Sequence, residues 1–240
     1  VVHAVDPTQS GKLDADIIFI GKSSSVDHIN NLRRIISAYL SSAYGYSESD
    51  ADTLAVFITV YNAVYRGKYD IFKSKYKDVV IKNLSQNNCG LSVNYKDWPG
   101  QSEIVIPLFD VNNGGLSTVD TSVISDSNVV DSMQEDSDKN VDNRKNMVDL
   151  KEREAEEASD KAQEAQKKAT AEQKKLDETK KEAADAQKKA DQAKKEAEKN
   201  PTAENKQIAE ETKKEAEQKQ EEVKEQEKKT EEAKKESKAK

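Results

Sequence analysis

The sequence is poor in the residues that build most catalytic and metal sites. It has one cysteine and two histidines in 240 residues. The single cysteine, Cys89, excludes an internal disulfide framework and a cysteine-based metal cluster. His3 and His28 have no further histidine as a partner, so neither supplies a zinc site or a hydrolase triad. The glycine motifs G-x-G-x-x-G and G-x-x-x-x-G-K-[ST] are also missing, which argues against a nucleotide-binding enzyme.

Long apolar segments are missing as well. Apolar runs such as Ile17–Ile20 and Ile104–Ile106 are far shorter than the roughly 20 residues that span a bilayer. The sequence therefore predicts no transmembrane span. The chain opens with Val1 in place of Met, which leads us to expect that an upstream segment such as a signal sequence has been removed or left out.

Charge is abundant, but no region carries charge of one sign alone. Charged residues make up 35% of the chain, and the formal net charge is −7. Nucleic-acid binding depends first on clustered positive charge that neutralises phosphates. Here the Lys-rich runs are interleaved with Glu. We therefore predict no nucleic-acid partner.

Core-forming residues are confined to the first half of the chain. All eight Tyr, all four Phe and the single Trp lie between Phe19 and Phe109. From Leu150 onward the apolar residues are almost all Ala, so no core of ordinary volume can form there. The composition predicts four segments: a flexible lead-in at residues 1–15, a globular α-rich domain at 16–110, a disordered acidic linker at 111–149 and a Lys/Glu/Ala-rich helical rod at 150–240.

Two apolar β-branched runs in the globular domain predict strands. They are Ile17–Ile20 and residues 103–108. An unpaired buried strand leaves its backbone groups unsatisfied, so we expect the two runs to pair with each other in one small sheet. Pro107 cannot donate to a strand ladder, so we expect the second strand either to lie at an edge of the sheet or to end there.

Three apolar stripes with helical spacing predict the helices of this domain. The first two are expected to begin after capping boxes of the type S-x-x-D at Ser24 and Ser47. The third runs from Tyr69 to Leu84. The predicted fold class is therefore mostly α, with a small α+β domain of three helices and a two-stranded sheet, followed by an acidic linker and a long charged helix or weak coiled coil.

The predicted linker contains one pattern that resembles a calcium loop. Acidic and amide side chains occupy the first, third, fifth and seventh positions of such a loop, at Asp136, Asp138, Asn140 and Asp142. The sharp turn of the loop needs Gly where this chain has Val141, and the bidentate Glu is replaced by Met147. We therefore predict no calcium site.

Small residues of the predicted rod recur in heptad register. One row repeats every seven residues from Ala155 to Ala197, and a second row three residues further on is interrupted by Glu172, Thr179 and Asn200. Because Ala buries little area, we expect only weak self-association and a helix stabilised by Glu–Lys pairs at i,i+4. A break at residues 200–201 leaves two alternatives open, a kinked rod or a hairpin.

The globular half offers no convergent polar site. Its carboxylates are scattered, and His28 is interpreted as a surface residue near a helix cap. The helical spacing of the tyrosines predicts core packing rather than a platform for stacking bases. These tyrosines are Tyr39, Tyr44, Tyr46, Tyr61, Tyr65, Tyr69 and Tyr76. We assign no catalytic, cofactor-binding or metal-binding residue, and we predict no cofactor and no enzyme activity.

Several short motifs are shared with a known family. They are Asn31-Leu32-Arg33-Arg34-Ile35, Tyr61-Asn62-Ala63-Val64-Tyr65-Arg66-Gly67, Gly90-Leu91-Ser92 and Ile106-Pro107-Leu108, together with Phe19–Gly21 and Trp98. With these motifs, residues 16–110 resemble the N-terminal region of the spirochaetal (borrelial) eighty-three/one-hundred-kilodalton membrane-associated antigen family. Members of that family also have residues upstream and a domain after the charged region, so we expect this chain to be a fragment or a shortened relative.

The resemblance implies an exported, immunogenic protein of the cell envelope, located in the periplasm or at the outer membrane. It implies no catalytic residue. Our first hypothesis is a structural or interaction protein whose small domain is held on a charged helical spacer, with an unknown protein partner. The alternative is an adhesin-like binding module that uses residues 16–110 and presents exposed tyrosines with Arg33, Arg34 and Arg66.

Overall fold

The computed structural model describes residues 1–24, 26–94, 98, 100–109, 118–135 and 137–239. It is mostly helical and divides into two compact units, unit 1 (Val1–Arg153) and unit 2 (Glu154–Lys240). The predicted fold class of a mostly helical chain with a small α+β part is confirmed. No helix among the described residues is both long enough and apolar enough to cross a membrane.

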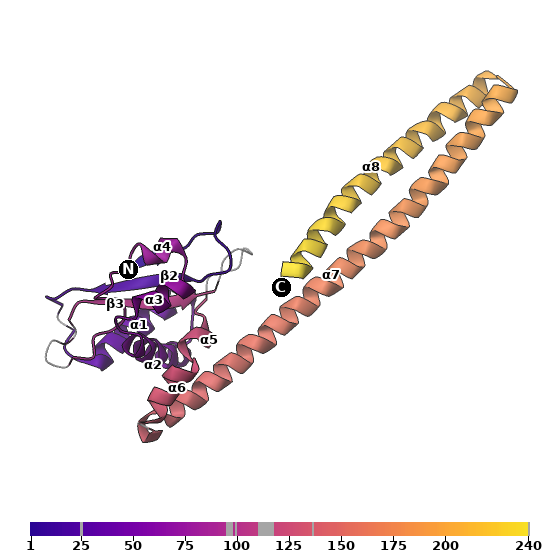
Figure 1. Ribbon diagram of the computed structural model, residues 1–240. Helices are drawn as coiled ribbons and strands as arrows, with labels where there is room; N and C mark the ends of the chain where they lie inside the picture. Colours follow the sequence, from indigo (N-terminus) through magenta and orange to yellow (C-terminus); the bar gives the residue numbers. More distant parts are fainter. Residues whose placement is uncertain (25, 95–97, 99, 110–117, 136, 240) are drawn as a thin grey trace. The chain divides into compact units, whose positions relative to one another are not determined.

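Unit 1 is built on a small antiparallel sheet with the strand order β1-β2-β3 (Figure 1). The strands are β1 (Val2–Ala4), β2 (Asp14–Ile20) and β3 (Ser102–Leu108). The predicted pairing of the two apolar runs is confirmed, since Ile17 lies opposite Val105 and Ile18 lies opposite Ile104. Every residue of β3 is buried, as expected when helices cover both faces of a sheet.

Strand β1 corrects two predictions, the two-stranded sheet and the flexible lead-in at residues 1–15. Val2–Ala4 pairs with β2 and makes the sheet three-stranded. A side-chain contact reinforces the pairing, because His3 Nδ1 lies 2.6 Å from Oδ1 of the buried Asp16. Three residues are too few to show strand periodicity, so this element depends on contacts that a sequence pattern does not reveal.

Helices of unit 1 follow the predicted stripes, with shifted boundaries. The first four are α1 (Ile29–Tyr44), α2 (Glu48–Val64), α3 (Tyr69–Lys75) and α4 (Asp78–Ile81). Ser47 caps α2 as predicted, and it accepts a hydrogen bond from the Asp50 N–H. The predicted cap at Ser24 is wrong, because α1 begins later and His28 is its cap. Figure 1 shows α1 and α2 below the sheet and α4 above it.

The predicted third helix is broken at Tyr76. This residue has extended backbone, with φ −107° and ψ 154°, and it separates α3 from α4. The break lets the Lys77 N–H donate to Leu13 O at 3.0 Å and turns the Lys77 side chain into the protein, where its ammonium group pairs with Asp14 at 2.8 Å. The apolar residues keep helical spacing across Tyr76, but the helix breaks there because the buried Lys77–Asp14 pair requires it.

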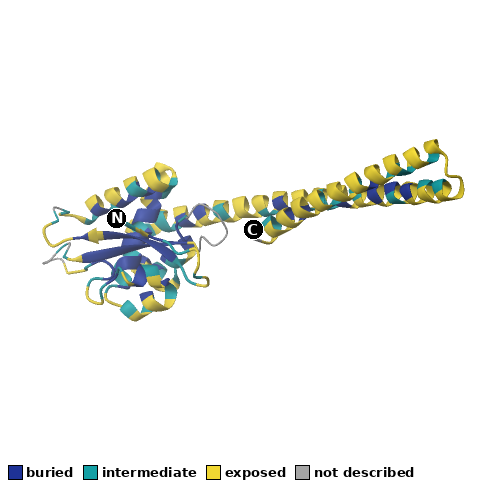
Figure 2. Cartoon of the chain, turned by 90° about the horizontal axis from the view of Figure 1, so that it is seen from above, coloured by how far each residue is buried: buried dark blue, intermediate teal, exposed yellow. Residues whose placement is uncertain are grey.

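Tyrosines form a large part of the core of unit 1, as predicted. Tyr61 and Tyr76 are fully buried, and their hydroxyl oxygens lie 2.9 Å apart. The other five tyrosines of the predicted set are buried or packed against the same cluster. The dark-blue strands and helix faces in Figure 2 show this core.

The outer edge of β3 is closed by side chains and loops rather than by another strand. The Val105 N–H donates to Asn62 Oδ1, and Asn62 Nδ2 donates to Val105 O, both at 2.8 Å. Glu103 pairs with Gly90 through backbone bonds in both directions. Pro107 lies on the same outward side, where its missing N–H removes no bond to β2, and its carbonyl accepts from the Asp120 N–H. The predicted edge position of this strand is confirmed.

We expect Asn62→Ala to lower the free energy of unfolding of unit 1 by about 2 kcal/mol, because it leaves two buried backbone groups of Val105 without a partner. Urea unfolding followed by intrinsic fluorescence measures this in unit 1 alone, since all Tyr and the Trp of the chain lie there. Asn83→Ala is the matched control, because Asn83 Nδ2 also donates to the carbonyl one turn earlier but bridges to no strand. Equal effects of the two substitutions would contradict the bridging role.

Helical structure also corrects the prediction of a disordered linker at residues 111–149. The described part of this segment contains α5 (Thr121–Ile124), α6 (Ser127–Gln134) and the start of α7 (Ser137–Lys199). Val129, Met133, Met147 and Leu150 are buried in the core of unit 1. Two of the Asp residues that suggested a linker instead cap helices, Asp120 at α5 and Asp126 at α6.

The calcium-like pattern also falls largely on a helix. Asp138, Asn140 and Asp142 lie in α7, whereas a calcium loop needs a turn at these positions. Asp136 lies outside the described residues.

Unit 2 is an antiparallel hairpin made of the C-terminal part of α7 and of α8 (Ala203–Ala239). Ion pairs of 2.9 Å connect the two helices at Lys168–Glu236, Lys180–Glu227 and Lys219–Glu182. This arrangement decides between the two alternatives for the break near residues 200–201 in favour of the hairpin. Figure 2 shows buried residues at intervals along it.

Candidate functional site

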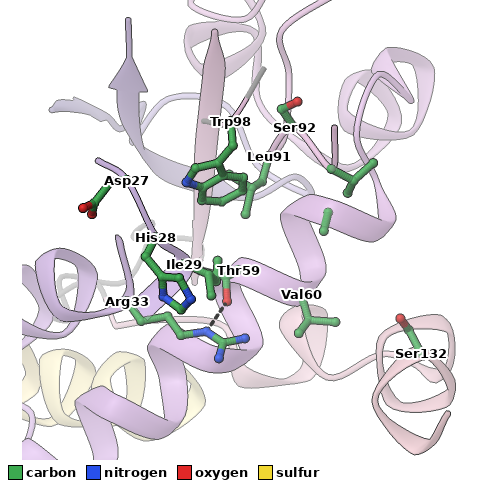
Figure 3. Close-up of a pocket in the computed structure, with 12 residues that line it drawn as sticks. Asp27, His28, Ile29, Arg33, Thr59, Val60, Leu91, Ser92, Trp98 and Ser132 are labelled. Atoms are coloured by element: carbon green, nitrogen blue, oxygen red, sulfur yellow. Dashed lines mark hydrogen bonds between the residues drawn. The ribbon is translucent and has the colours of Figure 1, made fainter. Parts of the chain in front are cut away.

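A cavity of about 560 Å³ lies in unit 1 between the start of α1, the middle of α2 and the segment after Gly90 (Figure 3). Its volume is within the range of sites for small ligands, roughly 300–1,000 Å³. Its lining includes Asp27, His28, Arg33, Thr59, Leu91 and Trp98.

Helices α1 and α2 position the polar groups of the cavity. His28 is the cap of α1, and its Nδ1 accepts from the Asn30 N–H at 3.1 Å, which leaves Nε2 to carry the ring proton. One turn further on, the Arg33 Nε–H donates to Thr59 Oγ1 at 3.0 Å. The Thr59 hydroxyl in turn donates to Val56 O at 2.8 Å, so the guanidinium group is held against α2.

The segment after Gly90 supplies the opposite wall. Leu91 N donates to Asn62 O at 2.9 Å, which places the buried Leu91 side chain beside α2. Arg66 fixes the same segment, since its guanidinium group donates to the carbonyls of Asn88, Gly90 and Gln101. In Figure 3, Trp98 and Leu91 stand together above His28 and Arg33.

Two polar groups of this cavity have donors that the described residues leave unused. The Arg33 guanidinium makes no ion pair with any described residue, and burial lowers the pKa of Arg33. The Trp98 Nε1–H is buried and has no hydrogen-bond partner in the described part of the chain. Buried polar groups are normally paired, so both donors are available to a ligand.

The other polar cluster of unit 1 surrounds Asp16. This buried carboxylate accepts from the Tyr39 hydroxyl at 2.6 Å and from the Tyr44 hydroxyl, and it contacts His3. Burial and the hydrogen bond to Asp16 raise the pKa of Tyr39 to about 12, so the hydroxyl remains a donor at neutral pH. The cluster is fully paired, which fits a structural role.

Most residues that the sequence singled out lie apart from the cavity. His3 joins the Asp16 cluster, Cys89 is buried, and burial raises the pKa of its thiol. Arg34 is exposed, and Arg66 is used by backbone carbonyls. The exposed face of tyrosines with three arginines, proposed for the adhesin-like alternative, is therefore not present in that form.

Sequence reasoning missed Arg33, Thr59 and Trp98 as neighbours in one cavity. A signal was available for Arg33 alone, since it lies between Leu32 and Ile36, two buried positions of the α1 stripe. Among the described residues, no group of three or more His, Cys, Asp or Glu side chains could hold a metal ion.

Comparison with known proteins concerns the whole chain. The family model of the Borrelia P83/100 protein matches residues 1–240. The chain belongs to this family. The match extends the resemblance beyond residues 16–110 to the charged hairpin, because it covers both units. The comparisons with curated proteins and with solved structures give no match.

Proposed function

We propose that this member of the Borrelia P83/100 family is a non-enzymatic structural and interaction protein of the cell envelope. Unit 1 is the recognition domain, and the hairpin of unit 2 is its charged spacer. Export to the periplasm or the outer membrane is part of this proposal, and it rests on the family. One observation supports the spacer role: α7 and α8 bury their small apolar side chains against each other.

The seam of the hairpin has polar residues that pair within the chain. Gln226 Nε2 donates to Glu172 Oε2 at 2.6 Å, and Thr230 Oγ1 donates to Glu172 O at 3.2 Å. Glu172 interrupted the heptad row in the sequence, and here it faces a polar partner from α8. Polar pairs at the seam of two packed helices select one register of the helices.

Small side chains fill the remainder of the seam. Ala186, Ala190 and Ala216 form a buried cluster, and Leu176 and Ala183 are buried along the same side of α7. The outer faces are exposed and charged. Such a hairpin has little apolar surface left for a second chain, which supports a spacer rather than an oligomerisation element.

The spacer can be tested on the full chain by carbodiimide coupling, which joins Lys and Glu side chains in direct contact. We expect links for the pairs Lys168–Glu236, Lys180–Glu227 and Lys219–Glu182 within a monomer, because each pair is 2.9 Å apart. Mass spectrometry of the monomer band identifies them. The exposed pair Lys213–Glu217 lies within α8 and is the control, since any helix would yield its link.

Links between α7 and α8 that occur only in a dimer band would contradict the spacer. The location can be tested separately, by adding a protease to intact and to permeabilised cells. We expect digestion on intact cells for an outer-surface protein and only after permeabilisation for a periplasmic one. Export would be contradicted if the protein resists the protease in both intact and permeabilised cells and is digested only after lysis.

A second candidate function is protein binding by residues 16–110, as in an adhesin. The observation that favours it is an exposed pair on α1, Arg34 and the 48%-exposed Ile35. Exposed apolar and arginine side chains are frequent in interfaces. Arg34→Glu should then abolish adhesion of the purified chain to host cells, whereas the exposed Lys22→Glu should not.

A further inference from the structure

The cavity of unit 1 contains a cation without a counter-ion. Of the five N–H donors of Arg33, one donates to Thr59, and no described carboxylate lies within ion-pair distance. Arg153, by contrast, pairs with Asp50 at 2.7 Å, and Arg66 donates to three carbonyls. Keeping an unpaired charge partly buried is unfavourable, so an anion in the cavity would remove this cost.

A second donor shares the cavity. The Trp98 indole N–H is buried, although such groups usually find an acceptor when water is excluded. Figure 3 shows Trp98 and the Arg33 guanidinium group on two sides of the same space. A ligand with acceptor atoms can therefore satisfy groups that the described part of the protein leaves unpaired.

The walls between these donors are apolar. Ile29, Val60, Ala63 and Leu91 line the cavity together with the Trp98 ring. Aliphatic and aromatic side chains of this kind gain free energy by covering an apolar ligand. The occupant should therefore join an anionic group to an apolar body.

The charged residues that line the cavity favour a ligand with a single negative charge. Arg33 is the only Lys or Arg among the described lining residues. His28 Nδ1 is used as an acceptor at the α1 cap, so this atom is not available to hold an anion. Asp27 also lines the cavity and would repel further negative charge. Phosphate groups, which are normally held by several donors or cations, fit this set poorly.

We propose that the cavity binds a small amphipathic monocarboxylate. Arg33 pairs with the carboxylate, Trp98 donates to an acceptor of the ligand, and Leu91, Val60 and Ala63 cover its apolar part. The site is independent of the spacer role proposed above and would remain if that role were wrong. A medium-chain fatty acid and an N-acylated apolar amino acid both combine a carboxylate with an apolar body. The titration described next distinguishes between them.

The test titrates the full chain with octanoate, with N-acetyl-leucine, with octan-1-ol and with inorganic phosphate. Trp98 is the only Trp of the chain, so its fluorescence reports the cavity directly. We expect one of the two carboxylates to bind, and octan-1-ol and phosphate to bind at least about 10-fold more weakly, since a charge-assisted pair is lost. The carboxylate that binds more tightly identifies the source.

Two variants separate the charge from the apolar wall. Arg33→Gln should weaken carboxylate binding about 10-fold and leave octan-1-ol unchanged, whereas the exposed neighbour Arg34→Gln should change neither. Ala63→Leu fills part of the cavity and should weaken both carboxylates and the alcohol. Unfolding midpoints of all three variants show that unit 1 is intact, and the Ala63→Leu result alone keeps the test decisive if Arg33→Gln misfolds.

Several results of these titrations would overturn the proposal. They are equal affinity for octanoate and octan-1-ol, unchanged carboxylate binding in Arg33→Gln, and no fluorescence response to either carboxylate. Tighter binding of phosphate than of both carboxylates would also overturn it.

Discussion

Lys77→Met is expected to lower the free energy of unfolding of unit 1 by about 4 kcal/mol. The Lys77 ammonium group lies 2.8 Å from Asp14 Oδ2 and donates to Asp6 O at 2.7 Å, and both charged side chains are fully buried. Methionine retains much of the volume but leaves the Asp14 carboxylate buried without its cation. Urea unfolding followed by intrinsic fluorescence measures the loss, because every Tyr and the Trp are in unit 1.

Two further variants separate charge from packing. Lys75→Met is the matched control, since Lys75 is partly exposed and its nitrogen lies 3.5 Å from Asp126, so we expect a loss below about 1 kcal/mol. The double variant Asp14→Asn/Lys77→Met removes both charges and should recover part of the stability. If Lys77→Met and Lys75→Met are equally mild, the buried pair is not what holds α4 against β2.

Gly90→Ala is expected to lower the free energy of unfolding by about 3–4 kcal/mol, of which about 1 kcal/mol comes from its positive φ of 83°. A Cβ at this position would lie 2.5 Å from Asn62 O and 3.0 Å from Arg66 Cα. Both are backbone atoms, Asn62 in the last turn of α2 and Arg66 just after the helix, and Asn62 O is fixed by a hydrogen bond from Leu91 N. The clash therefore cannot be relieved by a side-chain rotation.

Gly67→Ala isolates the contribution of the backbone conformation. Gly67 has a similar φ of 72°, but a Cβ there meets nothing within 4 Å. We expect a loss of about 1 kcal/mol for Gly67→Ala. Equal losses at the two glycines would show that α2 and the segment after Gly90 move apart at little cost, and the close contact would then have no energetic importance.

The structure of unit 1 explains why residues of the family motifs are needed. Within Tyr61–Gly67, Tyr61 is core, Asn62 closes the edge of β3, and Arg66 holds the segment around Gly90. Sequence patterns predicted the apolar members of this set through their spacing. They could not predict Asn62 or Arg66, because a polar residue in a helix is usually solvent-exposed and its partners lie more than 20 residues away.

The candidate cavity was hidden from the sequence for the same reason. Its residues come from α1 and the two residues before it, from α2, from α6 and from the segment that contains Leu91 and Trp98, and they share no spacing or motif. An unpaired donor is a property of three-dimensional surroundings. Arg33 therefore looked like one of several surface arginines until its neighbours were known.

Sequence by itself determined the elements whose signal is local and repeated. Pairing of the strands Ile17–Ile20 and Ile104–Ile106, the stripes of α1 and α2, and the heptad spacing of the charged tail all follow from apolar residues at fixed intervals. Only the tertiary structure decided the third strand at Val2–Ala4, the break between α3 and α4, and the helices in the Asp-rich segment. It also decided that the tail folds back on itself, since a seam of Ala and polar residues is compatible with several partners until Glu172 meets Gln226. The third strand, the break and the hairpin depend on polar contacts between residues that are distant in the sequence. The helices of the Asp-rich segment depend on local caps and on apolar residues that reach the core of unit 1. Neither kind of contact leaves a periodic trace in the chain.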